Sequence, residues 1–310
     1  MYSLRWLCGA FALVLAACGL GAQAIAAEPV HSQVLVLGRI SDDPRSHYEQ
    51  LKPLLDYVVP RMGDVGITEG RILMARNAQQ MASYLKRGRV DWVTETPGTA
   101  MALAQRSGAG VLLLTERNGR RQYRSVLFVR KDSPVQSLAD LRGRRVALQS
   151  PLSTSAYLLP LMDMLDADLR PGILLSPRDQ PAPDSVGYAL AGSASAIAAY
   201  VHKRLVDCGA LNDIEWNDER TMPPAFRRDM RIIHEGAPVP RAVELVRAGL
   251  DERVKQRLQE VLLQAADDPQ AAPALKQFFG TSGFYRMDAE SQHQLDRLRR
   301  GVDRIRLEVE

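Results

Sequence analysis

The sequence predicts an α/β protein made of two units of similar size. The chain has 310 residues, which is more than one compact core usually contains. Short β-like runs alternate with segments of helical spacing, a rhythm typical of a mainly parallel sheet covered by helices. This rhythm restarts after a polar, arginine-rich link at 116–124 (ERNGRRQYR). The restart indicates a second sheet.

The first unit is predicted to alternate strands and helices. Its strands are short aliphatic runs, and apolar residues recur at helical spacing between them. The expected strands lie at 33–38, 71–75, 90–94 and 111–115, with helices around 51–59, 81–85 and 100–104.

The second unit shows the same alternation, and the tail does not. Three tail segments, 241–265, 271–279 and 288–300, have the spacing of amphipathic helices with no strand between them. We expect these helices to cap one of the sheets. In the second unit the expected strands lie at 123–130, 144–149, 172–176 and 206–211, with helices at 137–141 and 195–202.

The composition is that of a soluble globular protein, with 46% hydrophobic and 25% charged residues. The net charge of +4 falls to +3 if residues 1–27 are removed, because they contain one charged residue, Arg5. Such a mild charge does not indicate nucleic acid binding. Cys208 is the one cysteine of the folded body, so we expect no internal disulfide there and a buried, inert thiol.

The N-terminus has the form of a secretory signal, with Arg5 followed by about a dozen apolar or small residues. Two exits compete. The run 15–18 (LAAC) resembles a lipobox, which would place a lipid on Cys18. The run 24–27 (AIAA) offers ordinary cleavage, and the complete signal end favours it. We therefore expect a signal peptide over 1–27 and an exported chain.

Motifs of common enzymes and metal sites are absent from the sequence after residue 27. It contains no G-x-S-x-G elbow, no phosphate loop and no G-x-G-x-x-G. The histidines have no metal-ligand spacing. We expect no metal, no cofactor and no enzymatic activity.

The segment 149–160 (QSPLSTSAYLLP) is the strongest candidate for a binding site. Ser153, Thr154 and Ser155 stand between a predicted strand and an apolar, helix-like run. A helix N-terminus exposes unpaired N–H groups with partial positive charge, and hydroxyl donors add to its affinity for phosphate-like groups. The simpler alternative is that one of the three residues caps the helix.

Three stretches in order, 90–108, 123–160 and 190–211, resemble the periplasmic phosphate, phosphite and phosphonate substrate-binding proteins of ABC importers. The resemblance is strongest where V-R-K-D-S-P and S-L-A-D-L precede S-T-S-A-Y-L-L-P. It implies a type II periplasmic binding protein fold, with two α/β lobes joined by a hinge and the C-terminal helices capping lobe one. It implies that lobe one takes residues 28–124 and 228–310, and lobe two residues 125–227.

The resemblance also implies roles for single residues. Ser153, Thr154 and Ser155 match the hydroxyls that hold the phosphonate oxygens in the family. Other family positions are replaced: the phosphate-binding histidine falls on Ser193 or Ala194. The family's two tyrosines and its late acidic group fall near Asn77 and Ala78, on Glu95, and near Arg241 and Ala242. The cage that surrounds the amine of an amino-phosphonate is therefore largely lost.

Glu95 has three alternative roles. Its carboxylate would repel a dianion. It could instead accept a hydrogen bond from a protonated oxyanion or pair with a cationic part of the ligand. It could also cap the following helix and face water.

These observations predict a non-enzymatic, monomeric periplasmic protein that captures a small phosphate-, phosphite- or phosphonate-like anion by hinge closure. Its partner would be a membrane ABC permease. Two alternatives remain: a sensor that presents its ligand to a signalling receptor, and a hydrolase that uses Ser153 or Ser155.

Overall fold

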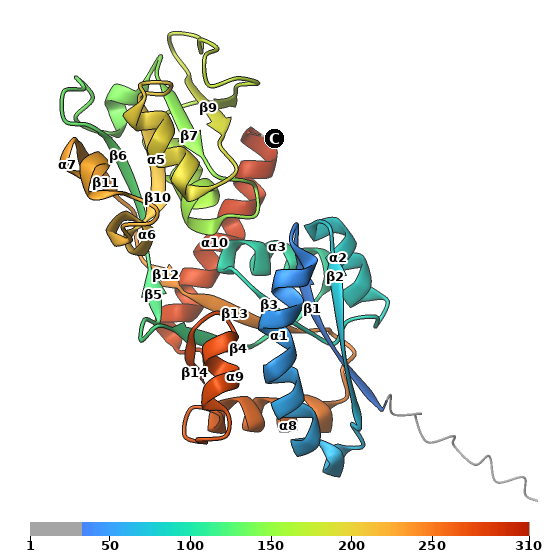
Figure 1. The fold of residues 1–310 in the computed structure, drawn as a ribbon. Helices are drawn as coiled ribbons and strands as arrows, with labels where there is room; N and C mark the ends of the chain where they lie inside the picture. Colours follow the sequence, from blue (N-terminus) through green and yellow to red (C-terminus); the bar gives the residue numbers. More distant parts are fainter. Residues whose placement is uncertain (1–32, 310) are drawn as a thin grey trace, which may run out of the picture. The chain divides into compact units, whose positions relative to one another are not determined.

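Two six-stranded sheets carry the fold in the computed structural model, which describes residues 33–309 (Figure 1). The expected signal peptide and Cys18 lie outside the described residues. A two-stranded antiparallel ribbon, β5 (Gln122–Tyr123) with β12 (Val239–Pro240), accompanies the two crossings between the sheets. The two α/β lobes expected from the sequence are therefore present and are joined twice.

The first sheet combines strands from the N-terminal part of the chain with strands from the tail. Its members are β1 (Val34–Ile40), β2 (Glu69–Ala75), β3 (Trp92–Glu95), β4 (Gly110–Arg117), β13 (Ala242–Val246) and β14 (Thr281–Tyr285), in the order β14-β4-β13-β3-β1-β2. β1 pairs in parallel with β3, and β13 pairs antiparallel with both β3 and β4. The carboxyl ends of β1, β3 and β4 therefore meet at one edge, where α/β sheets bind ligands.

Alternation along these strands divides the first lobe into two cores. Trp92 is buried with the helices α1 (Pro44–Val58), α8 (Glu252–Gln264) and α9 (Ala272–Gln277). The next residue, Val93, is buried on the other face, with α2 (Ala78–Lys86), α3 (Pro97–Ser107) and α10 (Ala289–Glu308).

The second sheet has the order β11-β6-β10-β7-β9-β8. Its strands are β6 (Ser125–Arg130), β7 (Arg145–Leu148), β8 (Pro171–Ile173), β9 (Val186–Leu190), β10 (Cys208–Asn212) and β11 (Met230–Glu235). Its helices are α4 (Leu159–Asp166), α5 (Ala194–His202), α6 (Asp213–Asn217) and α7 (Pro224–Arg228), and short turns η1 (Val59–Arg61), η2 (Gly63–Val65), η3 (Leu138–Leu141) and η4 (Thr154–Leu158) complete the fold. Cys208 is fully buried, as predicted.

The structure corrects three sequence predictions. The tail is not purely helical, because β13 and β14 complete the first sheet; all five residues of β13 are buried, so packing overrides the helical spacing. The chain does not return to lobe one at residue 228, because β11 pairs with β6 of the second sheet. It returns to lobe one only after β12. The strand β9 follows the Pro-rich segment 177–184, in a place where no strand was predicted.

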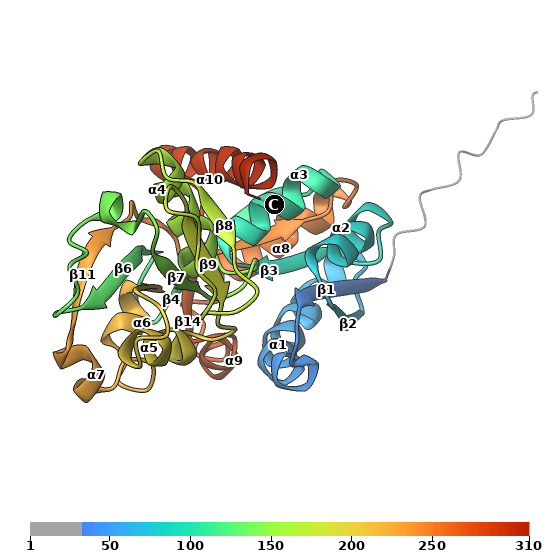
Figure 2. The same ribbon diagram turned by 90° about the horizontal axis from the view of Figure 1, so that it is seen from above.

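The last helix contacts both lobes. α10 lies against α3 of the first lobe and also contacts α4 of the second (Figure 2). Asp288 begins it with a capping box, accepting from Ser291 N at 2.8 Å. The helix therefore ties the lobes together in addition to covering the first sheet.

Candidate functional site

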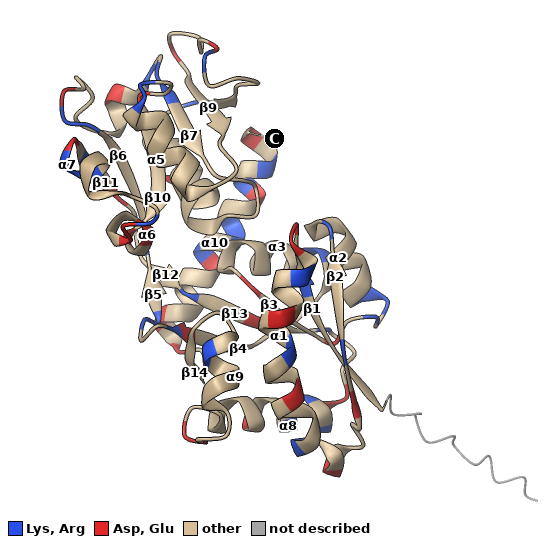
Figure 3. Cartoon of the chain, viewed as in Figure 1, with Lys and Arg blue, Asp and Glu red and all other residues tan. Residues whose placement is uncertain are grey.

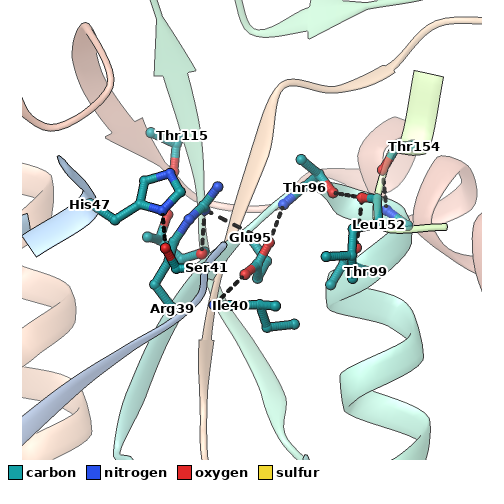
Figure 4. Close-up of polar contacts among 12 residues, drawn as sticks. Arg39, Ile40, Ser41, His47, Glu95, Thr96, Thr99, Thr115, Leu152 and Thr154 are labelled. Carbon is teal, nitrogen blue, oxygen red and sulfur yellow. Dashed lines mark hydrogen bonds and ion pairs between the residues drawn. The ribbon is translucent and has the colours of Figure 1, made fainter. Parts of the chain in front are cut away.

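The Ser153–Ser155 segment begins a helix, as predicted, and it also meets the other lobe. Ser153 is the cap, and its Oγ accepts from Ala156 N at 3.1 Å. Thr154 is buried, and its Oγ1 accepts from Gly98 N, in the first turn of α3, at 2.8 Å (Figure 4). A Cβ at Gly98 would lie 2.9 Å from that oxygen, so only glycine allows this close approach.

A second contact beside it joins the same two segments. The carbonyl of Leu152 accepts from Thr96 Oγ1 at 3.2 Å and from Thr99 Oγ1 at 2.9 Å (Figure 4). Thr99 is in the first turn of α3, and Thr96 is the residue before this helix. The lobes are thus in direct contact where the sequence predicts the anion's oxygens, and Ser155 is buried next to this contact.

Glu95 does not face water. It is 4% exposed, and its Oε1 accepts from Ile40 N at 3.1 Å while its Oε2 accepts from Thr96 N at 3.3 Å (Figure 4). Oε2 also lies 3.7 Å from Nη1 of Arg39. The carboxylate is therefore occupied by the ends of β1 and β3 and by one arginine, which excludes the prediction of a solvated cap.

Three arginines that sequence reasoning missed gather at this edge of the sheet. Arg39 is near the end of β1, Arg117 ends β4, and Arg241 stands between β12 and β13. The Nε of each is buried and has no hydrogen-bond partner among residues 33–309. Burial, together with the charges of Arg39 and Arg241, lowers the pKa of Arg117 to about 9. Three guanidinium groups thus repel one another in a poorly hydrated place.

A buried carboxyl group supports this cluster from the sheet. Glu244 of β13 is fully buried and accepts from Trp92 Nε1 at 2.6 Å, from Thr94 Oγ1 at 2.8 Å and from Thr115 Oγ1 at 2.7 Å. Burial raises its pKa, and the hydrogen bonds act against that rise. Arg117 Nη2 in turn donates to Thr94 Oγ1 at 3.3 Å. The network therefore fixes the position of Arg117.

Tyr123 links the arginines to the Ser153–Ser155 segment. It is buried in β5, with the guanidinium carbon of Arg241 4.9 Å from its ring centroid. Burial raises the pKa of Tyr123, while the charge of Arg241 and a hydrogen bond to Thr154 lower it. Arg241, Tyr123 and Thr154 thus form one chain of contacts, so the predicted hydroxyls lie close to one of the arginines.

Ser193 is not brought into that chain of contacts. It is the exposed N-cap of α5, and its Oγ accepts from Ala196 N at 3.2 Å. Asn77 has the same role for α2, accepting from Gln80 N at 2.9 Å. These two replacements of family binding residues therefore serve as helix caps.

A separate cavity of about 460 Å³ opens on the other side of the Leu152 contact. It is lined by the start of α2, one side of α3, the segment 150–153, η4 and the end of α10. Its lining does not include Arg39, Arg117 or Arg241. The charged site and this hollow are distinct features.

The signal for the arginines was present in the sequence but weak. Arg39 directly follows the predicted strand 33–38, and Arg117 comes two residues after the predicted strand 111–115. Polar residues at carboxyl ends of strands are candidates for ligand contact. Arg117 belongs to the polar, arginine-rich link 116–124, whose composition predicts exposed side chains. The structure corrects this expectation for Arg117, which is buried at 5% exposure.

Comparison with known proteins agrees with this architecture. Residues 38–292 match the model of a family described as ABC transporter, phosphonate, periplasmic substrate-binding protein. XAC2383 from Xanthomonas citri bound to chloride is 59% identical, with a TM-score of 0.86 over 89% of this chain and 99% of that one. The structure of XAC2383 bound to ATP is 58% identical, with a TM-score of 0.86 over 90% and 100%.

A more distant structure shares the fold. PhnD1 from Prochlorococcus marinus in complex with methylphosphonate has a TM-score of 0.65 and 16% identity, over 88% of this chain and 99% of that one. The two lobes have the type II periplasmic binding protein fold, and the resemblance stated from the sequence is confirmed. The chain belongs to the family of periplasmic phosphonate substrate-binding proteins of ABC transporters.

Proposed function

We propose that this chain captures a phosphate-, phosphite- or phosphonate-like anion between its lobes and delivers it to a membrane ABC permease. The observation that carries the proposal is the cluster of Arg39, Arg117 and Arg241, with three buried Nε–H groups that have no acceptor among residues 33–309. Unpaired buried donors are costly, and those of cations more so. A tetrahedral oxyanion offers the acceptors and the charge that guanidinium groups bind best.

The residues predicted from the sequence fit this site in different ways. Ser153, Thr154 and Ser155 would supply the hydroxyls and backbone N–H groups of lobe two, once Thr154 exchanges Gly98 N for the ligand. Glu95 would act by holding Arg39 rather than by touching the anion. Ser193 would contribute at the rim, beside the N-terminus of α5.

The arginines also favour particular ligands. The amine of an amino-phosphonate would add a positive charge beside three others, which is unfavourable. The ligands named for XAC2383, chloride and ATP, are both anions, and its high identity supports extending the proposed range to phosphate esters. Basic and acidic residues are interspersed over both lobes (Figure 3), which favours a small ligand over nucleic acid.

The proposal also covers catalysis, cellular location, oligomeric state and N-terminal processing. The protein would act without catalysis, as a periplasmic monomer released by cleavage after residue 27, with anchoring through Cys18 as the alternative. A sensor that feeds a signalling receptor is the second candidate, favoured by the loss of the amine cage at Asn77, Glu95 and Arg241. A hydrolase is disfavoured because the Ser153 hydroxyl is used as a helix cap.

A ligand screen tests the proposal. Phosphate, phosphite, methylphosphonate, sulfate and ATP should raise the melting temperature of the mature chain in a concentration-dependent way, because a ligand that binds only the folded state stabilises it. The neutral analogue trimethyl phosphate is the control and should leave the melting temperature unchanged. If none of the five anions shifts it at millimolar concentration, the proposed function is wrong.

A further inference from the structure

Phe279 has a backbone conformation that aromatic residues rarely adopt. It follows α9 with φ +54°, and Gly280 comes next with φ +66°. Asn118, opposite, has φ +51°, and its N–H donates to Gly280 O at 2.8 Å. The left-handed region is unfavourable for a bulky side chain, and such strain clusters at functional sites. A glycine or asparagine would form this turn more easily, so the ring itself is the feature to explain.

The ring faces two arginines of the binding site. The guanidinium carbon of Arg39 lies 4.7 Å from its centroid and that of Arg117 lies 4.8 Å from it. Both distances are within the range of cation–π attraction. The aromatic face thus offsets part of the repulsion between two cations that burial brings together.

The remaining contacts of the two arginines fix their other ends. Arg39 Nη1 donates to Thr94 O at 2.8 Å, and Arg117 Nη2 donates to Thr94 Oγ1 at 3.3 Å. With one terminal nitrogen of each arginine on Thr94 and each guanidinium carbon beside the Phe279 ring, the Nε–H groups keep no acceptor among residues 33–309. These buried N–H groups are therefore available to a ligand.

We propose that Phe279 is a positioning residue of the anion site, holding Arg39 and Arg117 side by side with their Nε–H groups ready for an oxyanion. The inference rests on the proposed function and extends it to a residue that no anion needs to touch. A purely structural role is the competing explanation, because Phe279 also packs on the buried Phe278 at 5.4 Å between centroids.

Three variants separate the two roles. Phe279→Leu keeps apolar bulk and removes the π face, and Phe279→Tyr keeps the π face. Phe284→Leu is the matched control: Phe284 packs on the same Phe278, at 6.2 Å, in the same core. Titration calorimetry with inorganic phosphate should give a dissociation constant raised about tenfold in Phe279→Leu and within about twofold of wild type in the other two. Urea denaturation should show Phe284→Leu destabilised without loss of affinity.

A measurement without ligand makes the test independent of the proposed function. The Nε–H proton signals of Arg39 and Arg117, assigned by Arg→Lys exchange, should show ring-current shifts in wild type and in Phe279→Tyr. These shifts should be lost in Phe279→Leu, or in Phe279→Met if the leucine variant does not fold. Unchanged signals or an unchanged dissociation constant would overturn the inference. A wild type that binds no phosphate but shows the shifts would contradict the function and leave the arrangement of Phe279 supported.

Discussion

Replacing Arg117 with methionine should raise the dissociation constant for phosphate about 100-fold, because truncating one partner of a buried charge pair costs about 2–5 kcal/mol. Ligand-free stability should not fall. Burial and two neighbouring arginines already disfavour the charge of Arg117, as its lowered pKa shows, and an apolar residue of similar length fits such a place. Titration calorimetry and urea denaturation of the same samples give both quantities.

Arg121→Met is the matched control for this variant. Arg121 is in the same link, but its side chain is 64% exposed and pairs with Glu116. Its loss should change the dissociation constant by less than about threefold, since exposed ion pairs contribute little. If Arg117→Met binds phosphate as well as Arg121→Met does, Arg117 is not part of the site.

Replacing Glu244 with leucine should lower the free energy of unfolding by about 3 kcal/mol. The change leaves the Trp92 indole N–H and two threonine hydroxyls without their acceptor inside the first sheet, and each buried unsatisfied group costs about 1–3 kcal/mol. Glu244→Gln should cost less, because its amide oxygen still accepts and threonine hydroxyls can rotate. Urea denaturation measures both.

An exposed glutamate provides the comparison for Glu244. Glu49 is on α1 with a side chain 61% exposed, and Glu49→Leu should change the unfolding free energy by less than about 0.5 kcal/mol. A Glu244→Leu protein as stable as Glu49→Leu would mean that the buried network does not support the sheet. Because the network also positions Thr94, phosphate affinity should fall in Glu244→Leu as well.

The alternation of strands and helices was sufficient to predict the two lobes, but not every strand. Apolar runs such as 71–75 and 111–115 are periodic and well bounded, and both became strands. The strand 242–246 could not be recognised from the sequence, because its central glutamate gave the run helical spacing. In the structure Glu244 accepts hydrogen bonds from three donors on β3 and β4. Residues more than 100 positions away in the sequence determine whether such a run forms a strand, and the local sequence pattern carries no information about them.

The candidate site shows the same limit. The Ser153–Ser155 segment could be predicted because its hydroxyls and helix start are local. The arginines could not, since Arg39, Arg117 and Arg241 are scattered over 200 residues and meet only when β1, β4 and β13 join one sheet. Glu95 was a candidate from its position after a predicted strand, but two of its partners, Ile40 N and Arg39, lie 55 and 56 residues away and could not be predicted.

The site also adjoins the crossings between the lobes. Tyr123 belongs to β5 and Arg241 directly follows β12, so two residues of the proposed anion site are in or beside the ribbon of β5 and β12. A charge bound there would act on the two segments that connect the lobes. This proximity gives the ligand a direct way to bias the hinge.

A crystal structure of the mature chain grown with inorganic phosphate tests the central claim most directly. We predict one phosphate with oxygens about 3 Å from the Nε atoms of Arg39 and Arg117, and with Thr154 as its contact from lobe two. Phosphate found only in the cavity between α3 and α10, with the arginines making no contact to it, would contradict the account.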